Sequence, residues 1–207
     1  MAMPATGFLK ERVPKAGLPM IEITIPRLGV ERPPSGKIVI GRIVSDYRGT
    51  LSCGGKLTPG AAERLRRLRA VVDIDVVSSD SFGTARDELA VIPLEPHILE
   101  TGEHDEEKRL YVSSHEPQRI AAFGNGRNDA RMLKTVRDAG GLAIAVDNGE
   151  GCAVEALVSA HIFITGINNA LDLLLDPIRC KATLRTLTSS AKKAAGSPGK
   201  RTLSRAC

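Results

Sequence analysis

The stretch IVSDYRGTLS, residues 43–52, runs from apolar residues typical of a buried strand into an aspartate, Asp46, and a Gly-Thr pair follows at residues 49–50. An Asp directly after a strand is a common turn former. The same residue could instead do chemistry, because ligands of parallel sheets gather at the ends of strands. The stretch alone leaves both interpretations open, and the residues around it have to decide between them.

Around this stretch, apolar runs typical of strands alternate with runs that have helical spacing. Strands are predicted at residues 20–26, 37–45, 72–79, 119–123, 142–146 and 161–165. Helices are predicted at residues 58–71, 81–90, 106–114, 128–139, 151–160 and 169–177. The first helix has Thr58 as its N-cap and Pro59 at its first position, and Gly140 stops the fourth. This order predicts an α/β fold, in which a Rossmann-like parallel sheet carries helices on both faces.

Length and composition predict one globular domain between two charged extensions. The chain has 207 residues, of which 42% are hydrophobic, enough for a sizeable core. Residues 20–181 are predicted to form the domain, and residues 1–19 and 182–207 to be disordered. The net charge of +5 does not belong to the domain, because residues 180–207 carry seven Lys or Arg and no acid. Nucleic-acid binding is therefore not expected, since a domain that binds nucleic acid carries its positive charge within the fold.

Composition also argues against a membrane protein and a secreted protein. No apolar run approaches the roughly 20 residues that span a bilayer, and no signal peptide is evident, so the cytoplasm is the expected compartment. Cys53, Cys152, Cys180 and Cys207 are widely spaced without a CxxC pair. Reduced thiols are expected rather than zinc ligands or disulfides. His104, within EHDEE, could bind a metal, but a solvated acidic face explains it better.

Three further features each have an ordinary explanation when taken singly. The turn GNGRND, residues 124–129, contains an Asn-Gly pair that could form a hairpin, and Asp129 replaces the third glycine of a dinucleotide-binding fingerprint. Ser78 is an unremarkable serine, and Lys108 could belong to a solvated helix face. Asp46, Ser78 and the GNGRND turn nevertheless all follow predicted strands, where a parallel sheet places its ligands.

The order of these pieces along the chain resembles the haloacid dehalogenase-like superfamily of phosphohydrolases. The signature of that superfamily is a nucleophilic Asp in DxxxT, a Ser or Thr, a Lys, and an acidic motif written G-D/N-G-x-N-D. Here the pieces are DYRGT from Asp46, Ser78, Lys108 and GNGRND. The continuation GNGRNDARMLKTV is most similar to the phosphorylation domain of P-type ATPases and their small soluble relatives. The resemblance covers roughly residues 20–179.

The resemblance implies a Mg²⁺-dependent phosphohydrolase or phosphotransferase that acts through an aspartyl-phosphate on Asp46. By the same resemblance, Ser78 would donate its hydroxyl to a phosphate oxygen, and Lys108 would offset the negative charge of the acids and the phosphate. Gly49 would let backbone N–H groups approach the phosphate, and Thr50 would orient the nucleophile.

The resemblance also implies a metal site. It would place Mg²⁺ on Asp46, on the backbone carbonyl of Arg48 and on Asp129, with Asn125 nearby. Oxygen ligands of this kind suit Mg²⁺, which neutralises charge between a carboxylate and a phosphate.

Two departures from the superfamily pattern limit these expectations. The 31 residues between Asp46 and Ser78 and the 29 between Ser78 and Lys108 leave no room for a cap domain or for the ATP-binding domain of a pump, so an uncapped core is predicted. Arg48 stands where many phosphatases of the superfamily have an Asp that protonates the leaving group and activates water. A guanidinium stays protonated near neutral pH, so it cannot replace that acid and base.

Alternatives therefore remain at this stage. The chain could be a catalytically weak phosphate-binding or regulatory module, in which Arg48 holds a phosphate or the acid of a partner. Dehalogenation by the same Asp needs no metal, so the Asn125 and Asp129 pair argues against it. The phosphorylated substrate is not identified by the sequence. An open site could accept a macromolecular substrate or rely on a neighbouring subunit as a lid, which would require a homo-oligomer.

Overall fold

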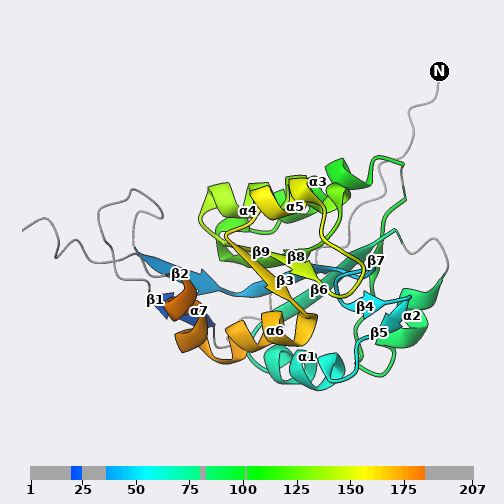
Figure 1. The fold of residues 1–207 in the computed structure, drawn as a ribbon, viewed down its shortest axis with the longest axis horizontal. Coiled ribbons are helices and arrows are strands. Elements are labelled where there is room, and N and C mark those ends of the chain that lie inside the picture. The colour runs from blue at the N-terminus through cyan, green and yellow to red at the C-terminus, as the bar shows by residue number, and fades with distance from the viewer. Residues whose placement is uncertain (1–19, 25–35, 80–82, 101, 185–207) are drawn as a thin grey trace, which may run out of the picture.

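The computed structural model describes residues 20–24, 36–79, 83–100 and 102–184, and its strands and helices form three layers (Figure 1). The middle layer is a six-stranded sheet in the order β10-β9-β8-β3-β6-β7, and every neighbouring pair in it is parallel. Its strands are β3 (Arg42–Asp46), β6 (Asp73–Ser78), β7 (His97–Ile98), β8 (Ile120–Gly124), β9 (Leu142–Asp147) and β10 (Ile162–Thr165). The helices are α1 (Ala61–Arg69), α2 (Thr84–Leu89), α3 (His104–Ser113), α4 (Ala130–Ala139), α5 (Val154–Ser159), α6 (Ile167–Leu175) and α7 (Pro177–Leu184). The predicted α/β fold with a Rossmann-like parallel sheet is confirmed.

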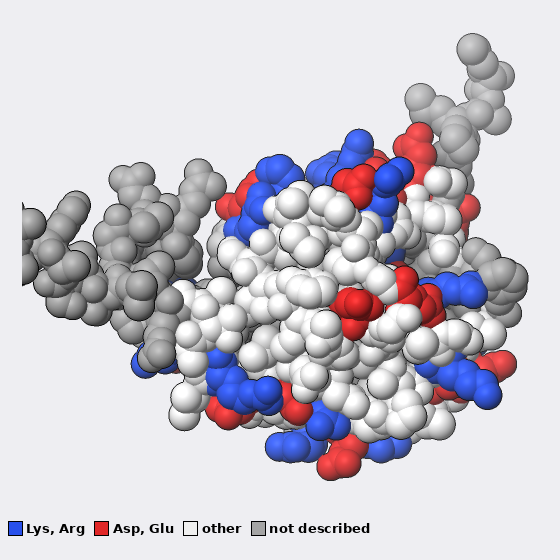
Figure 2. All heavy atoms as spheres, viewed as in Figure 1, with Lys and Arg blue, Asp and Glu red and all other residues white. Residues whose placement is uncertain are grey.

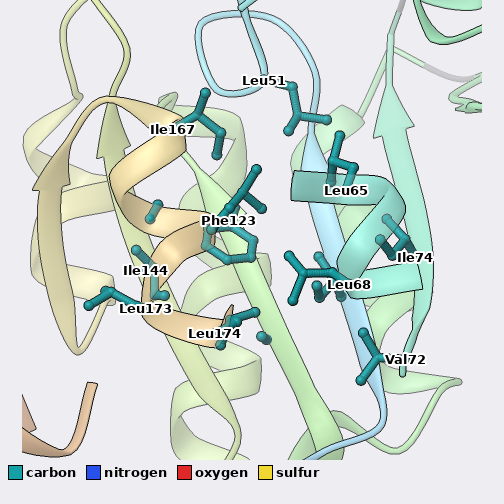
Figure 3. Packing of buried hydrophobic residues seen from close by; sticks show 14 of the residues in the cluster. Leu51, Leu65, Leu68, Val72, Ile74, Phe123, Ile144, Ile167, Leu173 and Leu174 are labelled. Atoms are coloured by element: carbon teal, nitrogen blue, oxygen red, sulfur yellow. The ribbon is translucent and has the colours of Figure 1, made fainter. Parts of the chain in front are cut away.

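Successive side chains along the strands point to opposite faces of the sheet, and both faces are buried. Ile43 and Phe123 belong to one apolar cluster, which α1 and α6 cover. In Figure 3 the Phe123 ring lies between these two helices. Val44 and Ala122 belong to a second cluster on the other face, under α3, α4 and α5. A fully buried Val, Ile or Phe side chain contributes about 1.5–3 kcal/mol, so helices on both faces follow from strands that are apolar on both sides.

The predicted strand at residues 37–45 is wrong in one respect, because it is two strands in two sheets. β2 (Lys37–Ile40) pairs antiparallel with β1 (Ile21–Thr24), and only β3 enters the main sheet. Gly41 lies between them. Its N–H donates to the carbonyl of Arg119 at 2.9 Å, and its carbonyl accepts from the N–H of Asp73 at 3.1 Å. These bonds tie Gly41 to the residues that lead into β8 and β6, so the chain changes sheets here while its backbone groups stay paired.

The predicted start of the first helix is also wrong. Thr58 is not its N-cap, because α1 begins at Ala61 after Gly60, whose φ is 86°. The N–H of Ala61 donates to the carbonyl of Thr58 at 3.0 Å, which closes a turn with Pro59 and Gly60 in its centre. A Pro followed by a Gly at positive φ is typical of a type II turn, and this turn competes with the cap. The predicted stop at Gly140 is confirmed, since Gly140 caps α4 with a φ of 93°.

A short hairpin, not predicted from the sequence, follows Asp46. Its strands are β4 (Ser52–Cys53) and β5 (Lys56–Leu57), and Gly54 and Gly55 join them with φ of 60° and 79°. Two consecutive residues at positive φ are typical of a tight hairpin turn. This hairpin, α1 and β6 account for the chain between Asp46 and Ser78. The described part of the chain therefore contains no cap domain in that interval, as predicted.

The domain limits remain predictions. Helix α7 is described as far as Leu184, three residues beyond the predicted limit of 181. Residues 1–19 and 185–207, which were predicted to be disordered, lie outside the described residues. Among the helices that the structure describes, none combines the length and the apolar character needed to cross a bilayer.

Candidate active site

The predicted site residues gather at the carboxyl ends of the strands, because parallel strands all end on the same side of the sheet. Asp46 is the last residue of β3, and Ser78 is the last residue of the neighbouring strand β6. Asn125 directly follows β8, which pairs with β3 on its other side. The chemistry-bearing groups therefore surround the end of the central strand β3.

Lys108 lies fully buried between two carboxylates. Its Nζ donates to Oδ1 of Asp46 and to Oδ1 of Asp129, both at 2.6 Å. The side chains of Lys108 and Asp129 have no exposed area, and that of Asp46 is 8% exposed. Helix α3 turns Lys108 inward, beside the buried Val112. The alternative of a solvated lysine is therefore wrong, because the side chain is buried against two acids.

Burial and charge together set the protonation of this cluster. The pKa of Asp46 is raised to about 6, mainly by burial and in part by the charge of Asp129, while Lys108 and Thr50 oppose the rise. Burial alone would lower the pKa of Lys108, but Asp129 and Asp46 outweigh burial and raise it. With both acids ionised, the cluster holds two negative charges against one positive charge. A buried net negative charge favours the uptake of a further cation.

The GNGRND turn holds Asp129 in place. Oδ2 of Asp129 accepts the N–H groups of Asn125 at 3.0 Å and of Gly126 at 2.8 Å. A Cβ on Gly124 would lie 2.5 Å from the Cβ of Asp129, so a side chain larger than hydrogen does not fit there. The turn leads through a short 3-10 segment, Arg127–Asp129, into α4. The hairpin interpretation of its Asn-Gly pair is therefore wrong.

The side chain of Asn125 ties three loops together. Its Oδ1 accepts the hydroxyl of Thr50 at 3.1 Å, and its Nδ2 donates to the carbonyl of Gly151 at 3.2 Å. Gly49 has a φ of 74°, and a Cβ there would lie 2.4 Å from the same Nδ2. Glycine is required at 49 both by its backbone conformation and by this contact. The side chain of Thr50 also interacts with Asp46 and lowers the pKa of that carboxyl.

Ser78 and Arg48 both lie near the carboxyl ends of the strands, but Ser78 is buried and Arg48 is exposed. Ser78 is 2% exposed and follows Val77, the residue that pairs with Asp46 across the two strands. Arg48 is exposed, and its backbone forms an isolated bridge with Ser52 at the base of the hairpin. The structure thus places Ser78 at the end of the strand beside β3, and Arg48 on the surface of the loop that follows β3.

Sequence reasoning missed the residues that hold the hairpin. The hydroxyl of the buried Tyr47 donates to the carbonyl of Gly55 at 2.9 Å. On the other side, the N–H of Gly54 donates to Oε1 of Glu150 at 2.6 Å. The hairpin is thereby fixed between the loop after β3 and the loop after β9. The only local signal was the Gly54-Gly55 pair.

The donor set fits a hard cation. One oxygen of Asp46 and one of Asp129 contact the same ammonium, so the two carboxylates lie close together. Carboxylate and carbonyl oxygens with water suit Mg²⁺, whereas zinc favours histidine and cysteine. Within the described residues, no group of three or more His, Cys, Asp or Glu side chains is arranged to hold a metal, and this includes the surroundings of His104.

Comparison with known proteins finds a protein that is similar to this chain in sequence. No protein-family model matches the chain. An uncharacterized protein of Methanocaldococcus jannaschii is 43% identical over 68 residues, which are 33% of this chain and 69% of that protein. The chain belongs to the same family as this archaeal protein.

Solved structures share the fold at low sequence identity. The cobalt-bound deoxy-D-mannose-octulosonate 8-phosphate phosphatase of Haemophilus influenzae is 12% identical, with a TM-score of 0.53 over 71% of this chain and 94% of that chain. The corresponding phosphatase of Moraxella catarrhalis, solved with magnesium, phosphate and the sugar acid, is 13% identical, with a TM-score of 0.54 over 69% and 90%. A Legionella pneumophila protein placed in the haloacid dehalogenase superfamily, subfamily III A, is 14% identical, with a TM-score of 0.55 over 70% and 87%. The chain has the haloacid dehalogenase-like fold.

Proposed function

We propose that the protein is a Mg²⁺-dependent phosphohydrolase or phosphotransferase that acts through an aspartyl-phosphate on Asp46. The observation that carries this proposal is the buried Lys108, which contacts both Asp46 and Asp129 at the end of the central strand. Burying a lysine between two acids costs desolvation free energy. A fold does not need such a charged cluster at the carboxyl ends of its strands for stability. Its value is electrostatic, because it fixes the nucleophile next to a positive charge where a phosphate would bind.

The reaction would proceed in two displacements at phosphorus. In the first, a carboxylate oxygen of Asp46 bonds to phosphorus while the bond to the leaving oxygen breaks, and the leaving group takes the electron pair and a proton from solvent. In the second, water bonds to phosphorus, loses a proton to solvent, and displaces the Asp46 carboxylate with release of inorganic phosphate. An alcohol in place of water would give phosphotransfer.

The surrounding residues would position these groups. Lys108 would hold the nucleophile and balance charge, and Thr50 would fix the orientation of the Asp46 carboxylate. Ser78 would donate its hydroxyl to a phosphate oxygen from the adjacent strand end.

The metal would be held by Asp46, Asp129 and the backbone carbonyl of Arg48, with Asn125 nearby. When bound, Mg²⁺ would neutralise negative charge between the carboxylate and the phosphate. The net negative charge of the buried cluster, and the oxygen character of its donors, support this assignment.

Arg48 favours a second candidate, a phosphate-binding or regulatory module with weak turnover. Its guanidinium cannot give a proton to a departing group and then take one from water near neutral pH. Its exposed position could instead hold a phosphate or an acid of a partner. The two candidates share the metal and the phosphate site, and they differ in turnover.

Hydrolysis of p-nitrophenyl phosphate, with and without Mg²⁺, separates the candidates. We expect Mg²⁺-dependent release of p-nitrophenol by the wild type, and a loss of at least about 100-fold in Asp46→Asn, which keeps the shape of the side chain but removes its charge. Asp138→Asn is the matched control, because Asp138 is partly exposed near the far end of α4 and pairs with Lys134. This control should retain full activity.

Circular dichroism and melting curves establish that the variants are folded. A folded Asp46→Asn protein with near wild-type turnover would overturn the covalent mechanism. Inorganic phosphate binding with Mg²⁺ but without turnover of the wild type would select the regulatory module.

A further inference from the structure

Helix α5 has its apolar side facing outward. Its buried residues are the small Ala156 and Ser159. Val154, Leu157 and Val158 are exposed to 69%, 42% and 62%. These three residues have the i, i+3, i+4 spacing of one helix face, so they form a continuous apolar stripe. A surface helix normally buries such a face, and an exposed one indicates an interaction surface.

Strand β10 is the edge strand of the sheet and pairs with β9, the strand that α5 contacts. Phe163 pairs in register with Ala145 of β9, and so points to the sheet face that α5 covers rather than to the α6 face. It is nevertheless 46% exposed. The α5 stripe and Phe163 thus contribute to the same side of the molecule.

The free edge of β10 has neither the charges nor the proline that usually protect an edge strand against pairing with another strand. Natural edge strands are kept apart by shortness, by charges, by proline or by bulges. The other edge of the sheet, β7, has only two residues. β10 has four residues, Ile-Phe-Ile-Thr, with neither charge nor proline, and within the described part of the chain it pairs with β9 alone.

The surface over these elements is poor in charge. Figure 2 shows mainly white spheres in the middle of the view, with acidic side chains to their right, in the region where Figure 1 draws α5 and β9. The charge on α5 is Glu155, which is outside the apolar stripe and pairs with Arg127 at 2.9 Å. Arg137 of α4 lies at the end of the stripe, where its guanidinium donates to the carbonyl of Val158 at 2.7 Å. A two-fold interface brings each patch against its own copy, so charges of one sign would repel, whereas the apolar stripe matches itself.

We propose that a second copy of this chain docks here, with the two β10 strands antiparallel across a two-fold axis and the two α5 stripes buried in the interface. Antiparallel pairing of identical strands satisfies the free edges of both sheets and extends them into one. The undescribed residues 185–207 do not suit this surface, because they are rich in Lys, Arg and Ser. The proposal does not depend on the activity proposed above.

Sedimentation velocity of the full chain over a wide range of concentration tests the proposal. The wild type is expected to sediment with twice the mass of the chain. Val158→Lys and Phe163→Lys should weaken dimerisation by at least about tenfold, because each would bury an unpaired ammonium in an apolar contact. Both side chains are exposed in one chain, so the monomer should stay folded, and circular dichroism checks this.

Leu110→Lys is the matched control. Leu110 is 52% exposed on α3, away from the stripe, so this variant should dimerise like the wild type. A wild type that keeps the mass of one chain at the highest concentration would overturn the proposal and leave the surface to a different partner. A dimer that persists unchanged in both stripe variants would overturn it too, because another surface would then form the contact.

Discussion

Lys108 keeps its charge inside the protein only because Asp46 and Asp129 surround its ammonium group. The hydrogen bonds at 2.6 Å replace the water that burial removes, and the two acids raise the pKa of Lys108 despite burial. Without this cation the ionised form of each acid would be destabilised, since buried like charges repel each other. The three residues therefore act as one electrostatic unit, to which a divalent cation would add the missing positive charge.

Removal of the ammonium should expose this dependence. Lys108→Met keeps the length of the side chain but leaves two buried acids without a counter-charge, so we expect a loss of about 3–5 kcal/mol in the free energy of unfolding. Mg²⁺ should then raise the melting temperature of the variant more than that of the wild type, because the metal restores charge balance. Scanning calorimetry with and without Mg²⁺ measures both effects.

Lys134→Met is the control, since Lys134 forms an exposed i,i+4 pair on α4, and such pairs contribute little. If Mg²⁺ stabilised the Lys108→Met variant no more than the wild type, the two acids would not share a cation site.

Asp129 and Asn125 should differ in what their loss does to the metal. Asp129→Ala removes one of two anionic donors, so it should weaken Mg²⁺ binding strongly. Asn125→Ala should weaken it less and lower kcat instead, because both ends of that amide are engaged, with Thr50 and with Gly151. Titration of turnover against Mg²⁺ separates the two parameters. Equal losses of Mg²⁺ affinity would make Asn125 a ligand of the same rank as Asp129.

These residues differ in how far the sequence could identify them. Asp46 and Asp129 follow strands and carry strong local motifs. Lys108 has no such signal, because EHDEEKR has the composition of a solvated helix. Its burial depends on how α3 packs over the sheet, which no local pattern encodes. It could be identified only from its place in the order of the superfamily motifs.

At the scale of elements, the sequence predicted the long periodic ones and failed where tertiary contacts decide. Every strand of the main sheet except β7 overlaps a predicted strand, because buried parallel strands are apolar throughout. The break at Gly41 was missed, since apolar residues continue through it and only the partners of each half differ. The hairpin and β7 were missed because strands of two residues have no period to detect.

The start of α1 shows a competition between two local signals. Thr-Pro can cap a helix, but Thr-Pro-Gly also favours a type II turn, and the turn forms here. The hydroxyl of Thr58 accepts a hydrogen bond at 2.7 Å from Asn148 in the loop after β9. A contact over 90 residues of sequence distance thus takes the group that would have capped the helix.

For the molecule as a whole, the order of strands and helices could be predicted from the sequence, because each buried strand needs helices on both of its faces. The outward-facing stripe on α5 cannot be predicted from the sequence, because the spacing of apolar residues does not say which side of the helix faces the sheet. The predicted division into a domain and two extensions depends on composition alone, and α7 lies across its C-terminal boundary.

Truncation should locate that boundary. Helix α7 packs against α6 and β1, and its Cys180 is fully buried in the core cluster with α6. A chain that ends at Leu184 should keep its melting temperature and turnover, because residues 185–207 are charged and lack apolar periodicity. A chain that ends at Asp176 should lose the contacts of α7 and melt lower by at least about 3 °C, which corresponds to about 1 kcal/mol in a domain of this size. Melting curves of the two truncations against the full chain measure both effects. A large loss of stability in the longer truncation would mean that residues 185–207 dock on the domain, and an unchanged shorter one would exclude α7 from it.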